Sequence, residues 1–153
     1  MGRALSEIRS DGSGWDAFVA VVERDGSPGP YSLVDIDRGD VLFDVAALPS
    51  GGYVALGSTG YTQNPSGESI SESAQPLVVL LNSNGSLLQR LKFSGGARQN
   101  QLNSIARLNS HWILGGMVNG PGTHSGDADR NLIIRLMASC ETVPICLRSE
   151  LRG

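Results

Sequence analysis

The stretch Asp44–Gly60 reads DVAALPSGGYVALGSTG, and a second copy follows at Ser104–Gly120 as SIARLNSHWILGGMVNG. Leu48 in the first copy aligns with Leu108 in the second, and Tyr53 aligns with Trp112 after one position drops out at the turn. A period of about 60 residues is typical of a supersecondary unit that repeats along the chain. The repeat therefore predicts an architecture, whereas it does not by itself name a reaction.

The repeat extends on both sides of this stretch. Phe18–Gly26, FVAVVERDG, maps onto Leu77–Gly85, LVVLLNSNG, at a constant spacing, and Leu132–Leu136, LIIRL, is a third copy. Each copy has an apolar run, a tight turn and a second apolar run, followed by a long polar loop and a third run. The middle copy adds a fourth run, so the pattern predicts four strands in one unit.

Seven strands are predicted with definite limits, at Ala17–Glu23, Tyr31–Asp37, Val45–Leu48, Tyr53–Ser58, Leu77–Leu81, Leu87–Phe93 and Trp112–Val118. Proline cannot donate to a strand ladder, so Pro28 and Pro30 are expected in a loop before the second of these strands. Asn84-Gly85 matches a two-residue hairpin turn, in which both residues take positive backbone angles.

Apolar runs without alternation, such as Leu77–Leu81 and Trp112–Leu114, predict strands that are covered on both faces. A parallel sheet would need amphipathic crossover helices, and no segment shows about ten residues of helical periodicity. A stack of antiparallel sheets is the alternative. In a propeller, each four-stranded blade is covered by its two neighbours.

The sequences LPSGGYVALGSTG at Leu48–Gly60 and LVVLLNSNGSLLQRLKFSGG at Leu77–Gly96 resemble a bacterial propeller repeat, described as quinoprotein-dehydrogenase-like or delta-60-type. The resemblance covers residues 15–138 and implies an all-β fold of antiparallel four-stranded blades, about two and a half of them. Such repeats serve scaffolds, adhesins, ligand binders and enzymes alike. The chain departs from the pattern at Asn109-Ser110-His111, which replaces the usual Asp-Gly-Gly turn, and the third copy lacks a clear fourth strand.

The repeat also predicts how the chain divides. We expect the end of a truncated repeat and a loop at 1–14, a partial blade of outer strands at 15–43, a complete blade at 44–102, a further blade at 103–138, and a tail or last outer strand at 139–153. The chain would then begin inside a unit, as a piece of a longer protein. Uncovered blade faces at both ends predict packing against neighbouring blades or self-association.

Charge and hydropathy exclude two classes of partner. The chain has 12 basic and 15 acidic residues, a net charge of −3, and no basic stripe for a nucleic-acid backbone. The chain has no run of about 18 apolar residues, so no membrane-spanning segment is predicted. Residues 1–14 lack the basic start and apolar core of a secretory signal, so the compartment is left open.

Two short acidic segments are the candidates for a metal site. Asp11 and Asp16 in DGSGWD, and Asp127 and Asp129 in SGDAD, place oxygen ligands in a partial resemblance to calcium loops. The full twelve-residue pattern with its terminal Glu is missing from both. Calcium and a simple preference of Asp for turns are both left open, and no other cofactor is expected.

No catalytic residue is assigned. The sequence has no GxSxG, phosphate-binding loop or HExxH motif. Cys140 and Cys146 close a small disulfide loop or stay two thiols, and the spacing permits either. No second Cys or His pair stands near them to complete a four-ligand zinc site.

Loop length gives the functional prediction. Long polar connections at 59–75, 94–101 and 119–130 alternate with turns of a few residues, and alternating strands bring the long ones to one face. The predicted ligand contacts are Tyr61, Gln63, Asn64, Arg98, Asn100, Asn119, His124 and Asp127. We expect a non-catalytic propeller segment that acts as a scaffold or binding surface for a protein or glycan. The alternatives are a fragment of a quinoprotein-like or hydrolase propeller enzyme whose active site needs missing blades, and loops that are solvated insertions.

Overall fold

A computed structural model describes most of the chain. It covers residues 2–4, 16–37, 39–60, 62–63, 69–70, 74–93, 100–109, 111–118, 130–137 and 149–151, and the side chains within 16–37, 39–60, 74–93, 100–109 and 111–117. These residues form strands and turns, and no helix occurs among them. The all-β prediction is therefore confirmed.

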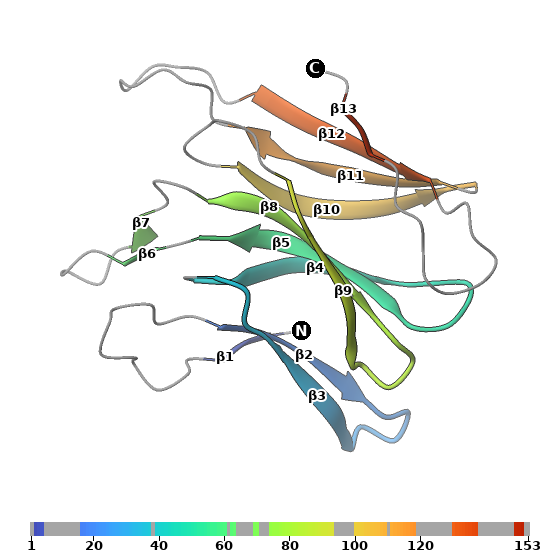
Figure 1. Ribbon diagram of the computed structural model, residues 1–153. Helices are drawn as coiled ribbons and strands as arrows, with labels where there is room; N and C mark the ends of the chain where they lie inside the picture. Colours follow the sequence, from blue (N-terminus) through green and yellow to red (C-terminus); the bar gives the residue numbers. More distant parts are fainter. Residues whose placement is uncertain are drawn as a thin grey trace.

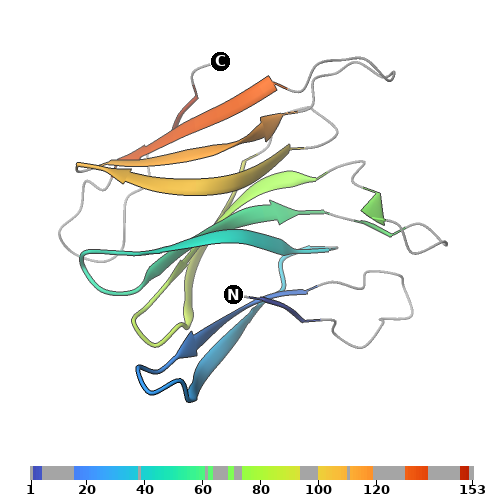
Figure 2. The same ribbon diagram turned by 180° about the vertical axis from the view of Figure 1, so that it is seen from behind.

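Three antiparallel sheets are stacked face to face (Figures 1 and 2). The N-terminal sheet contains β1 (Gly2–Ala4), β2 (Asp16–Val22) and β3 (Pro28–Val34), in that order. The central sheet contains β4 (Val41–Ala47), β5 (Tyr53–Thr59), β8 (Gln75–Leu81) and β9 (Leu87–Lys92), in that order. The C-terminal sheet contains β10 (Asn100–Leu108), β11 (His111–Val118), β12 (Arg130–Met137) and β13 (Ser149–Leu151), in that order. A two-stranded ribbon of β6 (Thr62–Gln63) and β7 (Ser69–Ile70) lies between β5 and β8 in the chain.

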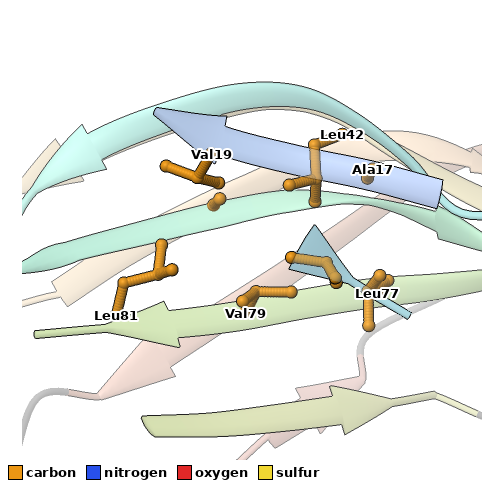
Figure 3. Packing of buried hydrophobic residues seen from close by; sticks show 8 residues of the cluster. Ala17, Val19, Leu42, Leu77, Val79 and Leu81 are labelled. Atoms are coloured by element: carbon orange, nitrogen blue, oxygen red, sulfur yellow. The ribbon is translucent and has the colours of Figure 1, made fainter. Parts of the chain in front are cut away.

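Each pair of neighbouring sheets encloses an apolar core. The core between the N-terminal and central sheets, here called the first junction, contains Ala17, Val19, Val34, Leu42, Ala55, Leu77, Val79 and Leu81 (Figure 3). The core between the central and C-terminal sheets, the second junction, contains Val54, Leu56, Val78, Leu80, Leu102, Trp112 and Leu114. The two inner strands of the central sheet, β5 and β8, are thus buried on both faces.

Strand β8 shows why its sequence has no polar alternation. Leu77, Val79 and Leu81 pack into the first junction, while Val78 and Leu80 pack into the second. Successive side chains of a strand point to opposite faces, so a strand between two sheets needs apolar residues at every position. The prediction that this run is covered on both faces is confirmed.

The central and C-terminal sheets share an irregularity at matching positions. A β-bulge follows Leu42 in β4, and another follows Leu102, its counterpart one repeat later, in β10. Opposite each bulge the neighbouring strand carries a glycine, Gly57 or Gly116. A Cβ atom on either glycine would overlap a backbone carbonyl oxygen of the bulged strand. The two sheets therefore repeat a local backbone approach that only glycine permits.

The expectation for Pro28 and Pro30 was wrong. Both residues lie in β3, which begins at Pro28 and ends at Val34, whereas a strand at Tyr31–Asp37 was predicted. Strand β3 pairs only with β2 and is the edge of its sheet among the described strands. An edge strand tolerates proline because one side of its backbone needs no ladder hydrogen bonds.

The hairpin turn at Asn84-Gly85 also differs from its prediction. Gly85 has a φ of 78°, but Asn84 has no positive φ, and the Gly85 N–H donates to the Asn82 carbonyl at 3.0 Å. The Asn82 side chain accepts hydrogen bonds from the N–H groups of Asn84 and Ser86, at 3.0 and 2.8 Å. The turn is therefore a three-residue loop with one left-handed glycine, set by a side chain outside the predicted pair.

Strand limits differ elsewhere as well. Strand β4 begins at Val41 and ends at Ala47, earlier than the predicted Val45–Leu48. In the predicted tail, residues 149–151 form β13 and pair with β12, so the C-terminal sheet has a fourth strand. The ribbon of β6 and β7 lies inside a segment that was predicted as loop only.

Candidate functional site

The stack has two unlike ends. Strands β5 and β8 pair up to Thr59 and Gln75, and β11 and β12 pair up to Val118 and Arg130, so the connections between them leave the same end of both sheets. We call this the long-connection end (on the left in Figure 1). Most connections at the opposite end are tight turns. Strand β12 ends at Met137 and β13 begins at Ser149, both at that opposite end, so not every long connection starts from the long-connection end.

Most predicted ligand contacts lie outside the described residues, namely Tyr61, Asn64, Arg98, Asn119, His124 and Asp127. Gln63 lies in β6, where only the backbone is described. Asn100 is the first residue of β10 and is 2% exposed. Its N–H donates to the Ala74 carbonyl at 2.9 Å, and its carbonyl accepts from the Ser58 hydroxyl at 2.8 Å. Asn100 was thus wrongly expected on a loop surface, because β10 starts there and buries it.

Three aspartates meet at the long-connection end of the first junction. One carboxylate oxygen from each of Asp16, Asp35 and Asp40 lies within 4.8 Å of the other two. Ala17 and Val34 are register partners in the N-terminal sheet, so Asp16 and Asp35 are the next facing pair. Asp40 directly precedes β4 of the central sheet. We call this group the carboxylate cluster.

Asp40 is the buried member whose surroundings are best defined. It is 0% exposed, and its Oδ2 accepts from the N–H groups of Ile36, at 2.7 Å, and Asp37, at 3.5 Å. Its Oδ1 forms no hydrogen bond of regular geometry, although the Thr59 hydroxyl lies close enough to the carboxyl to lower its pKa. Burial raises the pKa of the Asp40 carboxyl, and the charge of Asp35 adds to this, while the nearby Thr59 hydroxyl and the two backbone N–H groups act in the opposite direction.

Basic side chains from β9 hold the link between β3 and β4. Arg90 Nη1 donates to the Asp35 carbonyl oxygen at 3.1 Å. Lys92 Nζ forms an ion pair with Asp37 Oδ2 at 2.9 Å. These contacts hold the link against the central sheet. They thereby position the backbone of Asp35 and Asp40, the two members of the carboxylate cluster that lie in this link.

Sequence reasoning identified one member of this cluster. Asp16 was predicted as a metal ligand together with Asp11. The other three predicted metal ligands, Asp11, Asp127 and Asp129, lie outside the described residues. Asp35 and Asp40 were missed, although VDIDRGD is an acidic segment directly after a predicted strand. Cys140 and Cys146 also lie outside the described residues.

The second junction has neutral residues at the matching positions. Gln75 begins β8 as Asp16 begins β2 one repeat earlier, and Asn100 follows Asp40 at the spacing that separates Leu48 from Leu108. The Ser58 hydroxyl lies within hydrogen-bonding distance of the Gln75 and Asn100 carbonyl oxygens, at 3.1 and 2.8 Å. The same place in the two junctions thus carries carboxylates in one and amides in the other.

A shallow pocket opens elsewhere in the first junction. The side chains that line it are apolar except for the Tyr53 hydroxyl, and they belong to Val19, Ala20, Val21, Val22, Val45 and Tyr53. These side chains include no carboxylate, imidazole or thiol. The carboxylate cluster is therefore the candidate site.

Comparison of the chain with family models, with curated proteins and with solved structures finds no match. The resemblance to a bacterial propeller repeat therefore stays a prediction. Within the described part of the chain, no helix is long and apolar enough to cross a membrane.

Proposed function

We propose that this chain is a non-catalytic segment of a β-propeller-like protein, a scaffold that presents a binding surface for a protein or glycan at its long-connection end. The observation that supports this proposal is the convergence of connections from two adjacent sheets on one end. The β5–β8 and β11–β12 connections both leave there, from strands fixed by buried apolar cores. Variable loops on a rigid scaffold are the usual arrangement of a binding surface.

Loop grafting tests the binding proposal. The labelled full-length chain is screened on a glycan array and against displayed peptides, and the strongest ligand is titrated against two graft variants. In these variants a short Gly-Ser turn replaces residues 64–68 or 121–128. We expect both grafts to keep the circular dichroism spectrum and at least one to lose binding. A matched graft at Asn82–Ser86, on the opposite end, should bind normally; binding that survives both long-loop grafts contradicts the proposal.

The scaffold proposal includes further sheets, because the outward face of the N-terminal sheet is apolar. Phe18 faces Leu33 across the strands, and Ala20 faces Tyr31. Tyr31 is 69% exposed and Leu33 is 49% exposed. A contiguous apolar face of this kind marks an interaction surface.

The repeat pattern supports one partner for this face. Phe18 and Ala20 lie one repeat before Leu77 and Val79, which the N-terminal sheet covers in the first junction. The outward face is therefore the counterpart of a face that already packs against a sheet. We infer that another sheet of the same kind covers it, supplied in the isolated chain by a second copy in a head-to-tail contact.

Sedimentation velocity tests this contact. We expect the chain to self-associate at micromolar concentration, and Leu33→Lys to weaken association by about 10-fold or more, since a buried unpaired charge opposes the contact. Leu88→Lys, at a site on β9 that is similarly exposed at 51%, is the matched control and should associate like the unmodified chain. A stable monomer that binds no hydrophobic dye would contradict the proposal.

A further inference from the structure

The carboxylate cluster is electrostatically unfavourable by itself. Asp16 and Asp40 are buried, Asp35 is exposed, and their carboxylate oxygens lie within 4.8 Å of one another. Like charges at this distance repel strongly where water is excluded. A buried carboxylate is normally paired, protonated or bound to a metal ion. A positive charge close to the centre of the cluster, or a proton on Asp40, would relieve this repulsion.

A second observation points to a ligand. Asp40 is fully buried, and its Oδ1 makes no hydrogen bond. Thr59 is nearly fully buried, and its Oγ1 also lacks a partner with normal hydrogen-bond geometry. Val41 and Ser58 are register partners, which places Asp40 and Thr59 opposite each other. The Thr59 hydroxyl lies close enough to the Asp40 carboxyl to lower its pKa, but no hydrogen bond of regular geometry joins the two. A group that both oxygens contact would satisfy them better than this distorted contact does.

We propose that Asp16, Asp35 and Asp40 bind a calcium ion, with the Thr59 hydroxyl as a neutral oxygen ligand. All four donors are oxygens, which hard cations prefer, and Ca²⁺ accepts six to eight of them at 2.3–2.6 Å. Oxygens on opposite sides of such an ion stand about 4.6–5.2 Å apart, which fits the 4.8 Å limit of the cluster. Asp35 is exposed, so water can complete the coordination at this side.

The ion would join two sheets. Asp16 begins β2, Asp35 follows β3, and Asp40 precedes β4, so a shared ion fixes the N-terminal sheet to the central sheet. The second junction has Gln75 and Asn100 at the positions of Asp16 and Asp40, and amides do not carry the charge that attracts Ca²⁺. Calcium should therefore stabilise the first junction specifically. This inference does not depend on the proposed binding of a protein or glycan.

Calorimetric titration of the EDTA-stripped full-length chain with CaCl₂ tests the site. We expect one site with a Kd between about 10⁻⁵ and 10⁻³ M, the range of weaker calcium modules and sensors. Calcium at 100 times Kd should raise the folded-to-unfolded ratio about 100-fold in chemical denaturation. Asp40→Asn should lose at least about 10-fold in affinity, because it removes a charged ligand. Asp25→Asn, in an exposed turn at the other end, is the control and should bind normally.

The metal-free chain separates a ligand role from a structural one. An asparagine at position 40 can still accept the hydrogen bonds from the N–H groups of Ile36 and Asp37. In EDTA, Asp40→Asn should be at least as stable as the unmodified chain because it removes a buried charge, whereas with calcium it should be less stable. Equal destabilisation with and without calcium would overturn the proposal.

Other outcomes would overturn it too. The chain could show no binding heat, the Asp40→Asn chain could respond to calcium like the unmodified one, or Mg²⁺ could stabilise as strongly as Ca²⁺. Should Asp40→Asn fail to give the native circular dichroism spectrum, Asp35→Asn serves instead, because Asp35 is exposed. Asp35→Asn must then weaken calcium binding, and unchanged affinity contradicts the site.

Discussion

The first and second junctions share their packing plan and differ in their chemistry. Both bury alternate side chains of the central sheet under a neighbouring sheet. The first uses small side chains on the added sheet, Ala17, Val19 and Val34, and the second uses larger ones, Leu102, Trp112 and Leu114. At the long-connection end the first has the carboxylate cluster and the second has Gln75 and Asn100. At matching positions, the first junction thus carries carboxylates and the second carries neutral amides.

The second junction is also tied by a direct polar contact. The Ile105 N–H donates to Asp44 Oδ2 at 2.9 Å, from β10 to β4, at the two matching bulges. Strand β10 lies close to β4, β5 and β8, whereas the N-terminal sheet approaches the central sheet at β4. The second junction is therefore joined through its own backbone and side chains. The first junction has its own apolar core, and the contacts of Arg90 and Lys92 with Asp35 and Asp37 also join the link between β3 and β4 to the central sheet.

The largest effects should come from truncating the two cores. Leu77 and Leu114 are fully buried, one in each junction, so Leu77→Ala and Leu114→Ala should each cost about 2–5 kcal/mol of unfolding free energy. Urea denaturation followed by circular dichroism measures the loss. A single transition in both variants means that the junctions unfold together, and two transitions mean that they are separate. Leu88→Ala, at an exposed position, should cost far less; equal losses at all three sites would contradict the assigned cores.

The matching glycines should respond alike. Gly57→Ala and Gly116→Ala each force a Cβ onto a backbone carbonyl, which should destabilise each sheet by about 1–3 kcal/mol. Gly51→Ala adds a Cβ that meets nothing within 4 Å, but Gly51 has a φ of 87°, so about 1–2 kcal/mol of backbone strain is expected. Thermal and urea unfolding compare the three. If only one of Gly57→Ala and Gly116→Ala lowers the stability, the two sheets do not share the same packing at their bulges.

Placing a carboxylate in the second junction tests the chemical difference directly. Asn100→Asp puts a charge on a buried side chain, and we expect a loss of about 1–3 kcal/mol at neutral pH. The loss should shrink at acidic pH, where the new carboxyl is protonated. Gln89→Glu, on the outer strand β9, is the comparison for a change of charge alone. Unchanged stability of Asn100→Asp at pH 7 would show that this junction accepts charge as the first one does.

The smallest effect concerns pH in the absence of calcium. Burial raises the pKa of Asp40 above its ordinary value of 3.8, so the folded state keeps this proton at a pH where the unfolded chain has lost it. The associated stability is fully present below pH 3.8 and is lost as the pH rises through the folded pKa. Unfolding free energies in EDTA should therefore fall with rising pH more steeply in the unmodified chain than in Asp40→Asn. Parallel pH profiles would contradict the raised pKa.

The sequence by itself determined the strand content, the antiparallel pairing and the burial of both faces of β8. These features follow from local patterns, because apolar periodicity and turn residues act over a few neighbours. The repeat spacing also predicted which segments occupy matching positions, and the bulges after Leu42 and Leu102 agree with it. Strand limits were less predictable. Pro28 and Pro30 entered β3 because that strand is an edge, a property of the sheet and not of the residues.

Only the tertiary structure decided which polar residues meet. Asp16, Asp35 and Asp40 come from two sheets and the link between them, and no spacing rule brings three such aspartates together. Their approach depends on the register of β2 with β3 and on how the N-terminal sheet stacks on the central one. Asn100 shows the same dependence in reverse, since a polar residue after a loop became buried where β10 packs against the central sheet. The positions of such residues depend on packing against segments that are distant in the chain, so the neighbouring sequence does not predict them.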